Sequence, residues 1–315
     1  MRNSNITTAS NATTLPTTSE SSVMPDISLV GVAAIWGINI PLMKIGLEQV
    51  EPFFFNGVRL TISTAVLASF ALLERRRGLR PNADLKRSSV FVYGLLIGAL
   101  YQVLFLCGVE RTTSGNTALI IATVPMWTAL LARVFLRETL SWLSWCGLFL
   151  SLTGTIIVAF EKGDVTLESS KLRGNAIVLA AALVWAIGTV YSRPLLKKIS
   201  PMQLSAASSA IGLPVHLVLA AQCLPKDFSV LASASLWMII VYSGSLSSGL
   251  SQPMWNFGVR HAGAAHAAIV QNLIPVVAIV VAWLARGEIA TPNQFVGGAL
   301  ILGGLATMRI GRRIV

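Results

Sequence analysis

The chain carries one apolar segment twice, and this repetition constrains its fold more than any other feature. Pro125 precedes Glu138 by thirteen residues, and Pro275 precedes Glu288 by the same number. Further residues match at a separation of 150 or 149 positions, namely Gln102 with Gln252, Gly108 with Gly258, Gly147 with Gly297, Gly154 with Gly304, Trp36 with Trp185, Lys44 with Arg193 and Pro52 with Pro201. Matches in this order, with a single one-residue slip, indicate that the chain is one unit written twice.

Most of this duplicated chain cannot face water. Hydrophobic residues make up 54% of it and charged residues 12%, with a mean hydropathy of +0.71. Apolar runs long enough to cross a bilayer as helices recur along the whole length. We expect ten helices, five in each half, at residues 27–45, 53–73, 90–108, 115–136, 142–160, 174–192, 203–222, 235–257, 264–285 and 293–309.

These runs predict an all-α integral membrane protein with ten transmembrane helices. The first five-helix repeat is expected over residues 27–160 and the second over 174–310. Residues 1–26 are rich in Ser, Thr and Asn and lack a basic-then-apolar signal pattern. We therefore predict that they form a disordered N-terminal tail.

The net charge of +11 would suit a nucleic-acid partner, but its distribution indicates a membrane topology instead. Most basic residues fall in the connections on the side of the N-terminus, including those of the segments 75–87, 193–198 and 309–313. The positive-inside rule then places both termini in the cytoplasm. We predict the lipid bilayer as a partner and no nucleic acid.

Five helices per repeat is an odd number, so the second repeat must enter the membrane from the opposite side to the first. The two halves are therefore expected to be inverted repeats, related by a pseudo-two-fold axis in the membrane plane. In proteins built this way the substrate site lies near the bilayer midplane, between the halves. Polar side chains within the helices are the candidates for this site, because hydrocarbon excludes them unless they face the interior.

Neutral amides, indoles and hydroxyls dominate this set, and they suit a small zwitterionic or polar metabolite better than a polyanion. The predicted substrate-binding residues are Gln102, Gln252, Asn116 and His266 as polar contacts, Trp127, Trp36 and Trp255 as apolar walls, and Tyr101, Asn39, Gln271 and Arg59 beside them. Asn116 and His266 are 150 positions apart, and we expect both on the same cavity. Packing at helix contacts is the alternative reading for the small and hydroxyl residues, and interfacial anchoring the alternative for Trp36.

Charge inside the membrane is sparse. Arg59 lies about two turns into the second helix, where an uncompensated charge costs at least ~2.5 kcal/mol. It could pair with a substrate carboxylate or a carbonyl cluster, or it could snorkel to the interface. No Asp or Glu lies in mid-helix, which leaves His216 and His266 as candidates for proton coupling. Glu138 and Glu288 fall at helix ends and are interpreted as structural.

Pro125 and Pro275 lie near the middle of their helices. A proline there removes one backbone donor and is expected to free the carbonyls near Ile121 and Gln271. Gating by bending and a static kink both remain open. The glycine pairs Gly147/Gly154 and Gly297/Gly304 predict either a close approach within the chain or a homodimer contact.

The residues above carry a resemblance to a known family. The segment AAIWGINIPLMK and the segment FFFNGVR resemble the opening motifs of the EamA family in the drug/metabolite transporter superfamily. The doubled segments NTALIIATVPMWTALLARVFLRE and HAAIVQNLIPVVAIVVAWLARGE resemble its repeated proline-to-glutamate helices. The second repeat departs from the first in having Arg193 for Lys44 and Gly287 before Glu288.

This resemblance covers residues 27–310 and implies two inverted five-helix EamA repeats. It also implies export or exchange of small metabolites, often amino acids, across the inner membrane of a bacterium. The family is broad in substrate, so the resemblance does not identify the cargo.

We therefore predict a multi-pass inner-membrane transporter that exports or exchanges small polar metabolites, above all amino acids or their relatives, by alternating access. The alternatives are a carrier or flippase for lipid-linked or drug-like amphiphiles, and a non-transporting scaffold or sensor. An enzyme is not predicted, because the chain has no HExxH motif, paired aspartates or Ser–His–Asp set at a membrane surface. The three cysteines have no metal-ligand spacing, and neither a metal nor a cofactor is expected.

Overall fold

The computed structural model describes residues 23–161, 165–166, 168–286 and 291–312, and within them every regular element is a helix. The first repeat comprises α1 (Val23–Leu47), α2 (Pro52–Arg76), α3 (Arg87–Tyr93), η1 (Gly94–Leu100), α4 (Tyr101–Val109), α5 (Ser114–Ala122), α6 (Val124–Phe135) and α7 (Trp142–Glu161). The second comprises α8 (Ser169–Leu196), α9 (Pro201–Gln222), η2 (Phe228–Ala232), α10 (Ala234–Tyr242), η3 (Ser243–Leu250), α11 (Ser251–Ala262), α12 (Ala264–Val270), α13 (Leu273–Arg286) and α14 (Pro292–Arg312).

These elements build the expected membrane-spanning bundle. Nine helical segments of the described residues are long and apolar enough to cross a bilayer. The tenth expected span corresponds to α10, η3 and α11, which follow one another without interruption from Ala234 to Ala262. Its central part, SGSLSSGL, and the following α11 are both less apolar than α10. The prediction of an all-α membrane protein is confirmed.

The first helix begins earlier than expected. α1 starts at Val23, so Asp26 belongs to its first turn instead of the predicted tail. The remainder of that tail, residues 1–22, lies outside the described residues.

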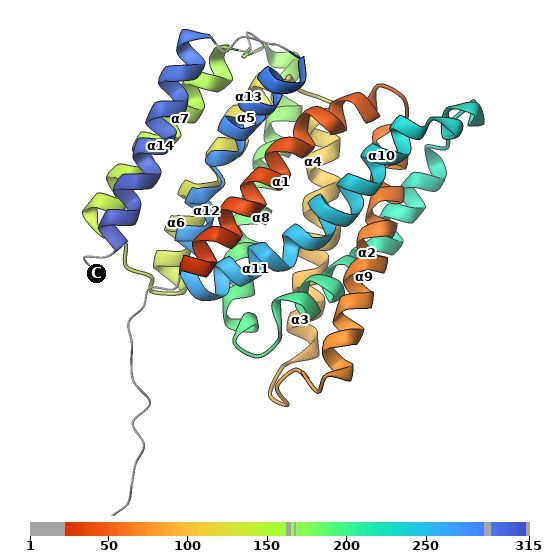
Figure 1. Ribbon diagram of the computed structural model, residues 1–315, viewed down its shortest axis with the longest axis horizontal. Coiled ribbons are helices and arrows are strands. Elements are labelled where there is room, and N and C mark those ends of the chain that lie inside the picture. The colour runs from red at the N-terminus through yellow and green to blue at the C-terminus, as the bar shows by residue number, and fades with distance from the viewer. Residues whose placement is uncertain (1–22, 162–164, 167, 287–290, 313–315) are drawn as a thin grey trace, which may run out of the picture.

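The two repeats run in opposite directions through the membrane. α1 begins and α14 ends on one face of the molecule, named here the N-terminal face, whereas α8 begins on the opposite face (Figure 1). Equivalent helices of the two repeats also make equivalent contacts with the other repeat. α2 packs on η3 as α9 packs on η1, and α1 packs on α11 and α13 as α8 packs on α4 and α6. A pseudo-two-fold axis in the membrane plane produces this pattern of contacts.

α7 and α14 form a closely packed pair at one edge of the bundle (Figure 1). Gly147 faces Gly304, and Gly154 faces Gly297, so that backbone meets backbone at both levels. Small residues allow this close approach of two helices in a membrane. The glycines are used within one chain and are therefore not available for a homodimer contact.

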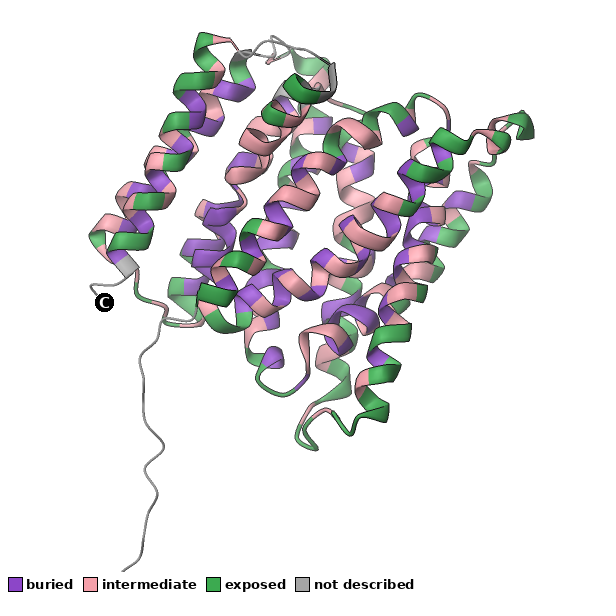
Figure 2. Cartoon of the chain, viewed as in Figure 1, coloured by how far each residue is buried: buried purple, intermediate pink, exposed green. Residues whose placement is uncertain are grey.

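Buried residues gather on the inward-facing sides of the helices (Figure 2), and many large apolar residues are exposed. The exposed set includes Phe70, Phe91, Phe149, Trp283 and Phe295, as expected where lipid is the solvent.

The doubled proline helices are each interrupted. α5 ends at Ala122 and α6 begins at Val124, while α12 ends at Val270 and α13 begins at Leu273. Pro125 and Pro275 thus lie in the first turn of a new helix, where a missing N–H costs little. The expectation that the carbonyl oxygen of Gln271 lacks a backbone donor is wrong, because this oxygen accepts the N–H of Ile274 at 2.9 Å.

Candidate functional site

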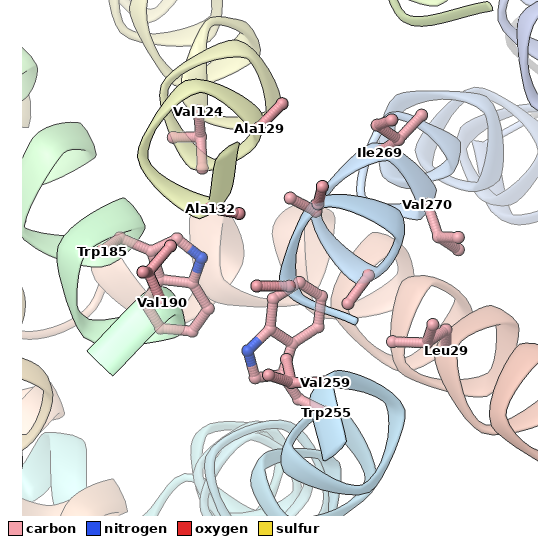
Figure 3. Close-up of a cluster of buried hydrophobic side chains, with 14 of the residues drawn as sticks. Leu29, Val124, Ala129, Ala132, Trp185, Val190, Trp255, Val259, Ile269 and Val270 are labelled. Carbon is pink, nitrogen blue, oxygen red and sulfur yellow. The ribbon is translucent and has the colours of Figure 1, made fainter. Parts of the chain in front are cut away.

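Four aromatic side chains meet in the middle of the bundle and form what we name the aromatic cluster: Trp36, Tyr101, Trp185 and Trp255. The three indoles lie within 5.7–5.8 Å of one another by ring centroids, and the Tyr101 ring lies 4.8 Å from Trp185. Figure 3 shows Trp185 and Trp255 pointing toward each other inside the buried apolar cluster of the protein. Each repeat supplies two of the four rings, so the cluster lies on the boundary between the halves.

The two repeat-related tryptophans of this cluster differ in their hydrogen bonds. The indole Nε1 of Trp36 donates to the Ser251 hydroxyl at 2.7 Å and to the Ser247 carbonyl at 3.0 Å. The buried Nε1 of Trp185 has no partner among the described residues. The repeat explains this difference, because the position equivalent to Ser251 is Tyr101, whose ring packs against Trp185 at an interplanar angle of 46° and does not accept its N–H.

Arg59 is a buried charged residue that bonds to Gln102, the neighbour of Tyr101 in the chain. Its side chain is 7% exposed, so the predicted alternative of snorkelling to the interface is wrong. Nε donates to Asn56 Oδ1 at 2.8 Å, Nη2 to Gln102 Oε1 at 3.3 Å and Nη1 to Ser243 Oγ at 3.3 Å. These partners are neutral side chains and not a carbonyl cluster.

No carboxylate within the described residues forms an ion pair with Arg59. A buried charge that lacks a counter-ion is costly, since hydrogen bonds from neutral groups replace only part of its hydration. The site is therefore electrostatically suited to an anionic group.

The two predicted glutamines are also unequal. Gln102 Oε1 accepts from Arg59, whereas the buried Gln252 Oε1 has no partner among the described residues. Under the 149-residue offset Arg59 corresponds to Ser208, whose short hydroxyl replaces the long guanidinium. Gln102 thus accepts a hydrogen bond from a cation, whereas the equivalent oxygen of Gln252 has no donor among the described residues.

Asn39 supplies a second unused acceptor. Its side chain is buried on α1, three residues after Trp36, and its Oδ1 has no partner among the described residues. Trp127, by contrast, donates Nε1 to its own helix neighbour Thr123 Oγ1 at 3.0 Å and does not join the aromatic cluster. Gln271 is half-buried at the break between α12 and α13.

Asn116 and His266 do not share a cavity, and this expectation is corrected. Asn116 clamps the connection before α8, donating to Thr166 O at 2.8 Å and accepting from Thr166 N at 3.0 Å. His266 Nε2 lies 2.8 Å from Asp26 Oδ1 at the N-terminal face. The physical reason is the inverted symmetry itself, because an axis in the membrane plane maps one face onto the other.

A second polar cluster joins the two repeats at the N-terminal face. The Glu138 carboxylate accepts from Arg193 and from the backbone N–H groups of Ala264 and Ala265 at 3.1 and 3.3 Å. It thereby occupies the N-terminus of α12, where the helix dipole favours negative charge. Glu138, Arg193 and His266 are among the residues that line a pocket of about 260 Å³ at this place. Glu288, the repeat equivalent of Glu138, lies outside the described residues.

In the charged contacts of this face, the acids come from the first repeat and their basic partners from the second. Asp26 and Glu138 belong to the first repeat, whereas Arg193, His266 and Arg309 belong to the second. These contacts therefore cross the boundary between the halves and join the two repeats at this face.

Sequence reasoning missed three partners of the Arg59 site. Asn56 and Ser243 bond to the guanidinium directly, and His216 bonds to Asn56. The spacing of Asn56 and Arg59 by three residues was the one local signal, since it places both on the same helix face. The contact between residues 56 and 216 had no signature in the sequence.

Comparisons with known proteins agree with this architecture. The model of the EamA-like transporter family matches residues 23–160 and again 172–310. The transporter YoaV of Bacillus subtilis is 27% identical over 284 residues, which cover 89% of this chain and 94% of that protein. A probable terminal-alkyne amino-acid exporter of Streptantibioticus cattleyicolor is 29% identical over 289 residues, covering 91% and 93%.

A bacterial inner-membrane relative and a crystal structure extend the comparison. The inner membrane transporter YedA of Escherichia coli K12 is 25% identical over 286 residues, covering 90% of each chain. One solved structure superimposes with a TM-score of 0.77 at 19% identity, covering 92% of this chain and 98% of the other, and so supports the fold. The family model matches both repeats of a chain whose helices span the membrane, and the protein therefore belongs to the EamA-like transporter family and is a multi-pass membrane transporter.

Proposed function

We propose that the protein exports or exchanges small amino-acid-like metabolites across a bacterial plasma membrane by alternating access. The observation that carries this proposal is Arg59, a buried guanidinium without a carboxylate partner among the described residues. A cargo carboxylate supplies the missing counter-charge. A bidentate contact to the two Nη groups fits, because Asn56 holds Nε at 2.8 Å, whereas the Nη bonds to Ser243 and Gln102 are longer, at 3.3 Å each, and a cargo carboxylate can replace them.

The amine of such a cargo has its own partners. Gln252 Oε1 and Asn39 Oδ1 are buried acceptors without donors among the described residues. The aromatic cluster lies beside them and offers ring faces that attract a cation and enclose an apolar side chain. In this proposal Arg59 binds the carboxylate of a zwitterion, and the acceptors of Gln252 and Asn39 bind its amine. The relative from Streptantibioticus cattleyicolor, whose name gives it as a probable amino-acid exporter, is consistent with this cargo class.

A groove on the outside of the bundle is lined mainly by apolar residues, and this lining argues against the alternative of a lipid-linked cargo. Phe54, Leu217, Ala221, Leu224 and Trp237 are among the residues that line it. Its polar members are occupied, since Thr61 donates to Gly57 O and Trp237 Nε1 to Leu231 O. The groove thus offers an acyl chain a surface but offers a headgroup no charged or unused polar partner.

Alternating access follows from the way in which the halves are joined. The ion pair of Glu138 with Arg193 and the hydrogen bond between Asp26 and His266 connect opposite repeats, so they must separate when the N-terminal face opens. We assign this face to the cytoplasm from its excess of basic residues. A reporter enzyme fused to the C-terminus, active on only one side of the membrane, tests this orientation.

Arg59→Gln is expected to raise the KM for an amino acid about tenfold, because a charge-assisted hydrogen bond of ~1.5–3 kcal/mol is lost. The measurement is uptake into proteoliposomes of leucine, methionine and phenylalanine, each paired with its carboxamide, which lacks the carboxylate. The variant should lose the preference for the acid and leave the KM for the amide unchanged. Arg111→Gln is the matched control, since Arg111 is an exposed arginine paired with Glu110. An unchanged ratio of acid to amide in Arg59→Gln would rule out the carboxylate contact.

Gln252→Leu tests the other end of the site. The variant removes an acceptor without changing the shape of the residue greatly, and we expect a three- to tenfold higher KM for phenylalanine, about the value of one hydrogen bond. Phenylpropionate, which lacks the amine, should be unaffected. Equal losses for both compounds would contradict the amine contact and indicate a packing role for Gln252.

A further inference from the structure

A chain of hydrogen bonds runs from Arg59 across the boundary between the repeats. Arg59 Nε donates to Asn56 Oδ1 at 2.8 Å, Asn56 Nδ2 lies 3.2 Å from His216 Nδ1, and His216 Nε2 lies 2.8 Å from the carbonyl oxygen of Gly98. Asn56 and His216 are each 1% exposed. The chain joins α2 to α9 and ends on the π-helical segment η1.

The two ends of this hydrogen-bond chain, the Arg59 guanidinium and the Gly98 carbonyl, determine where each proton lies. A guanidinium only donates, so the oxygen of Asn56 must face Arg59 and its NH₂ must face His216. A carbonyl only accepts, so His216 must carry its proton on Nε2. Nδ1 is then the acceptor for Asn56, and the ring is the neutral Nε2–H tautomer. A second ring proton would oppose the NH₂ of Asn56 and add a positive charge near Arg59.

We propose that His216 is a positioning residue for Arg59, acting through Asn56. The neutral imidazole orients the Asn56 amide, and the amide oxygen fixes Nε of the guanidinium. The outer edge, Nη1 and Nη2, is thereby aimed at the side occupied by Ser243 and Gln102. This inference rests on the proposed function, because the edge held in place is the one assigned to the cargo carboxylate. His216 consequently shapes the site and does not carry a coupling proton.

A close helix contact gives this arrangement its rigidity. A Cβ atom at Gly212 would overlap the carbonyl oxygen of Gly98, and a Cβ atom at Gly98 would overlap that of Ser208. η1 and α9 therefore meet backbone to backbone one turn from His216. The Gly98 carbonyl is held within reach of the imidazole, so the far end of the chain is fixed by the fold.

Three variants separate positioning from packing. His216→Leu removes both the donor and the acceptor, whereas His216→Gln keeps one of each on its amide. Ser209→Ala is the control, because Ser209 and Thr64 form another polar contact between α2 and α9 at 2.7 Å without touching Arg59. Uptake of phenylalanine and of phenylalaninamide into proteoliposomes provides the KM and kcat of each.

We expect His216→Leu to raise the KM for phenylalanine about tenfold, the loss typical of a misplaced charge-assisted hydrogen bond. The kcat and the KM for phenylalaninamide should not change, His216→Gln should restore most of the loss, and Ser209→Ala should resemble the unmodified protein. Adding His216→Leu to Arg59→Gln should have no further effect. Equal losses for both substrates, or a failure of His216→Gln to restore the KM, would overturn the positioning role.

A measurement without cargo distinguishes this inference from the proposed function. The chain has three histidines, His216, His261 and His266, so ¹⁵N-histidine labelling and the His216→Gln variant identify the His216 signals. At neutral pH they should report the Nε2–H tautomer, and Asn56→Leu should shift them. A doubly protonated or Nδ1–H ring would overturn the inference even if Arg59 binds a carboxylate. The expected tautomer with an unchanged acid-to-amide ratio in Arg59→Gln would reject the cargo assignment alone.

Discussion

Gly98→Ala is expected to lower the free energy of unfolding by about 3 kcal/mol, the upper range for overpacking a filled interior. A Cβ atom at this position would overlap the Ser208 carbonyl oxygen and would lie 3.0 Å from the Ser208 carbonyl carbon and 3.3 Å from the Gly212 nitrogen. All three atoms belong to the backbone, so no change of rotamer relieves the contact. η1 and α9 must separate, and the packing between the repeats must change with them.

Thermal melts in detergent and the abundance of the variant in membranes measure this effect. Gly298→Ala is the matched control, because α14 leaves the space around Gly298 open, with no atom within 4 Å of an added Cβ. Alanine is the better helix former, so this control should be neutral or more stable by up to about 1 kcal/mol. A Gly98→Ala protein as stable as the control would contradict the close contact of η1 with α9.

Glu138→Ala is expected to lower the free energy of unfolding by about 2 kcal/mol. The substitution leaves Arg193 without its carboxylate and the N–H groups of Ala264 and Ala265 without their acceptor. Breaking a fully buried ion pair costs ~3–5 kcal/mol. The value here is smaller because the side chains of Glu138 and Arg193 remain 14% and 28% exposed.

The same melts test this prediction, with Glu110→Ala as the control. Glu110 also pairs with an arginine, Arg111, but these side chains are 33% and 48% exposed, and exposed pairs contribute little. Glu138→Asp should recover part of the stability, since a shorter carboxylate still places negative charge near the N-terminus of α12. Equal melting of Glu138→Ala and Glu110→Ala would refute the assignment of Glu138 as the tie between the halves.

The architecture could be predicted from the sequence because its causes, the length of the apolar runs and the number of spans in each repeat, are local or additive along the chain. Apolar runs of bilayer length predict spans wherever they occur. A repeat with an odd number of spans must invert, whatever its side chains do. The prolines show the limit of such reasoning: a kink within a long helix was expected near Pro125 and Pro275, and each helix instead ends and starts again just before its proline. A kinked helix and a helix that ends and starts again both accommodate the missing N–H of a proline, and only the packing of the folded chain selects between them.

The arrangement of the candidate site could be predicted only in part. Trp36, Tyr101 and Trp255 lie in the aromatic cluster and Gln102 contacts Arg59, because polar and aromatic groups in mid-helix must face the interior; their role in binding stays a prediction. Asn116 and His266 were misplaced because their equivalence under the repeat was taken as proximity. Inversion through an axis in the membrane plane turns equivalent positions near a helix end into positions on opposite faces.

Sequence alone determined that this chain is a duplicated, inverted, ten-helix membrane protein, since hydropathy and repeat parity are properties of the linear order of residues. The tertiary structure decided which polar groups have partners. Arg59 with Gln102 and Ser208 with Gln252 are equivalent pairs in the sequence, yet Gln102 accepts from a cation, whereas Gln252 Oε1 has no donor among the described residues. Asn56 reaches His216 across 160 residues. Such bonds require atoms about 3 Å apart, and only the packed helices determine those distances.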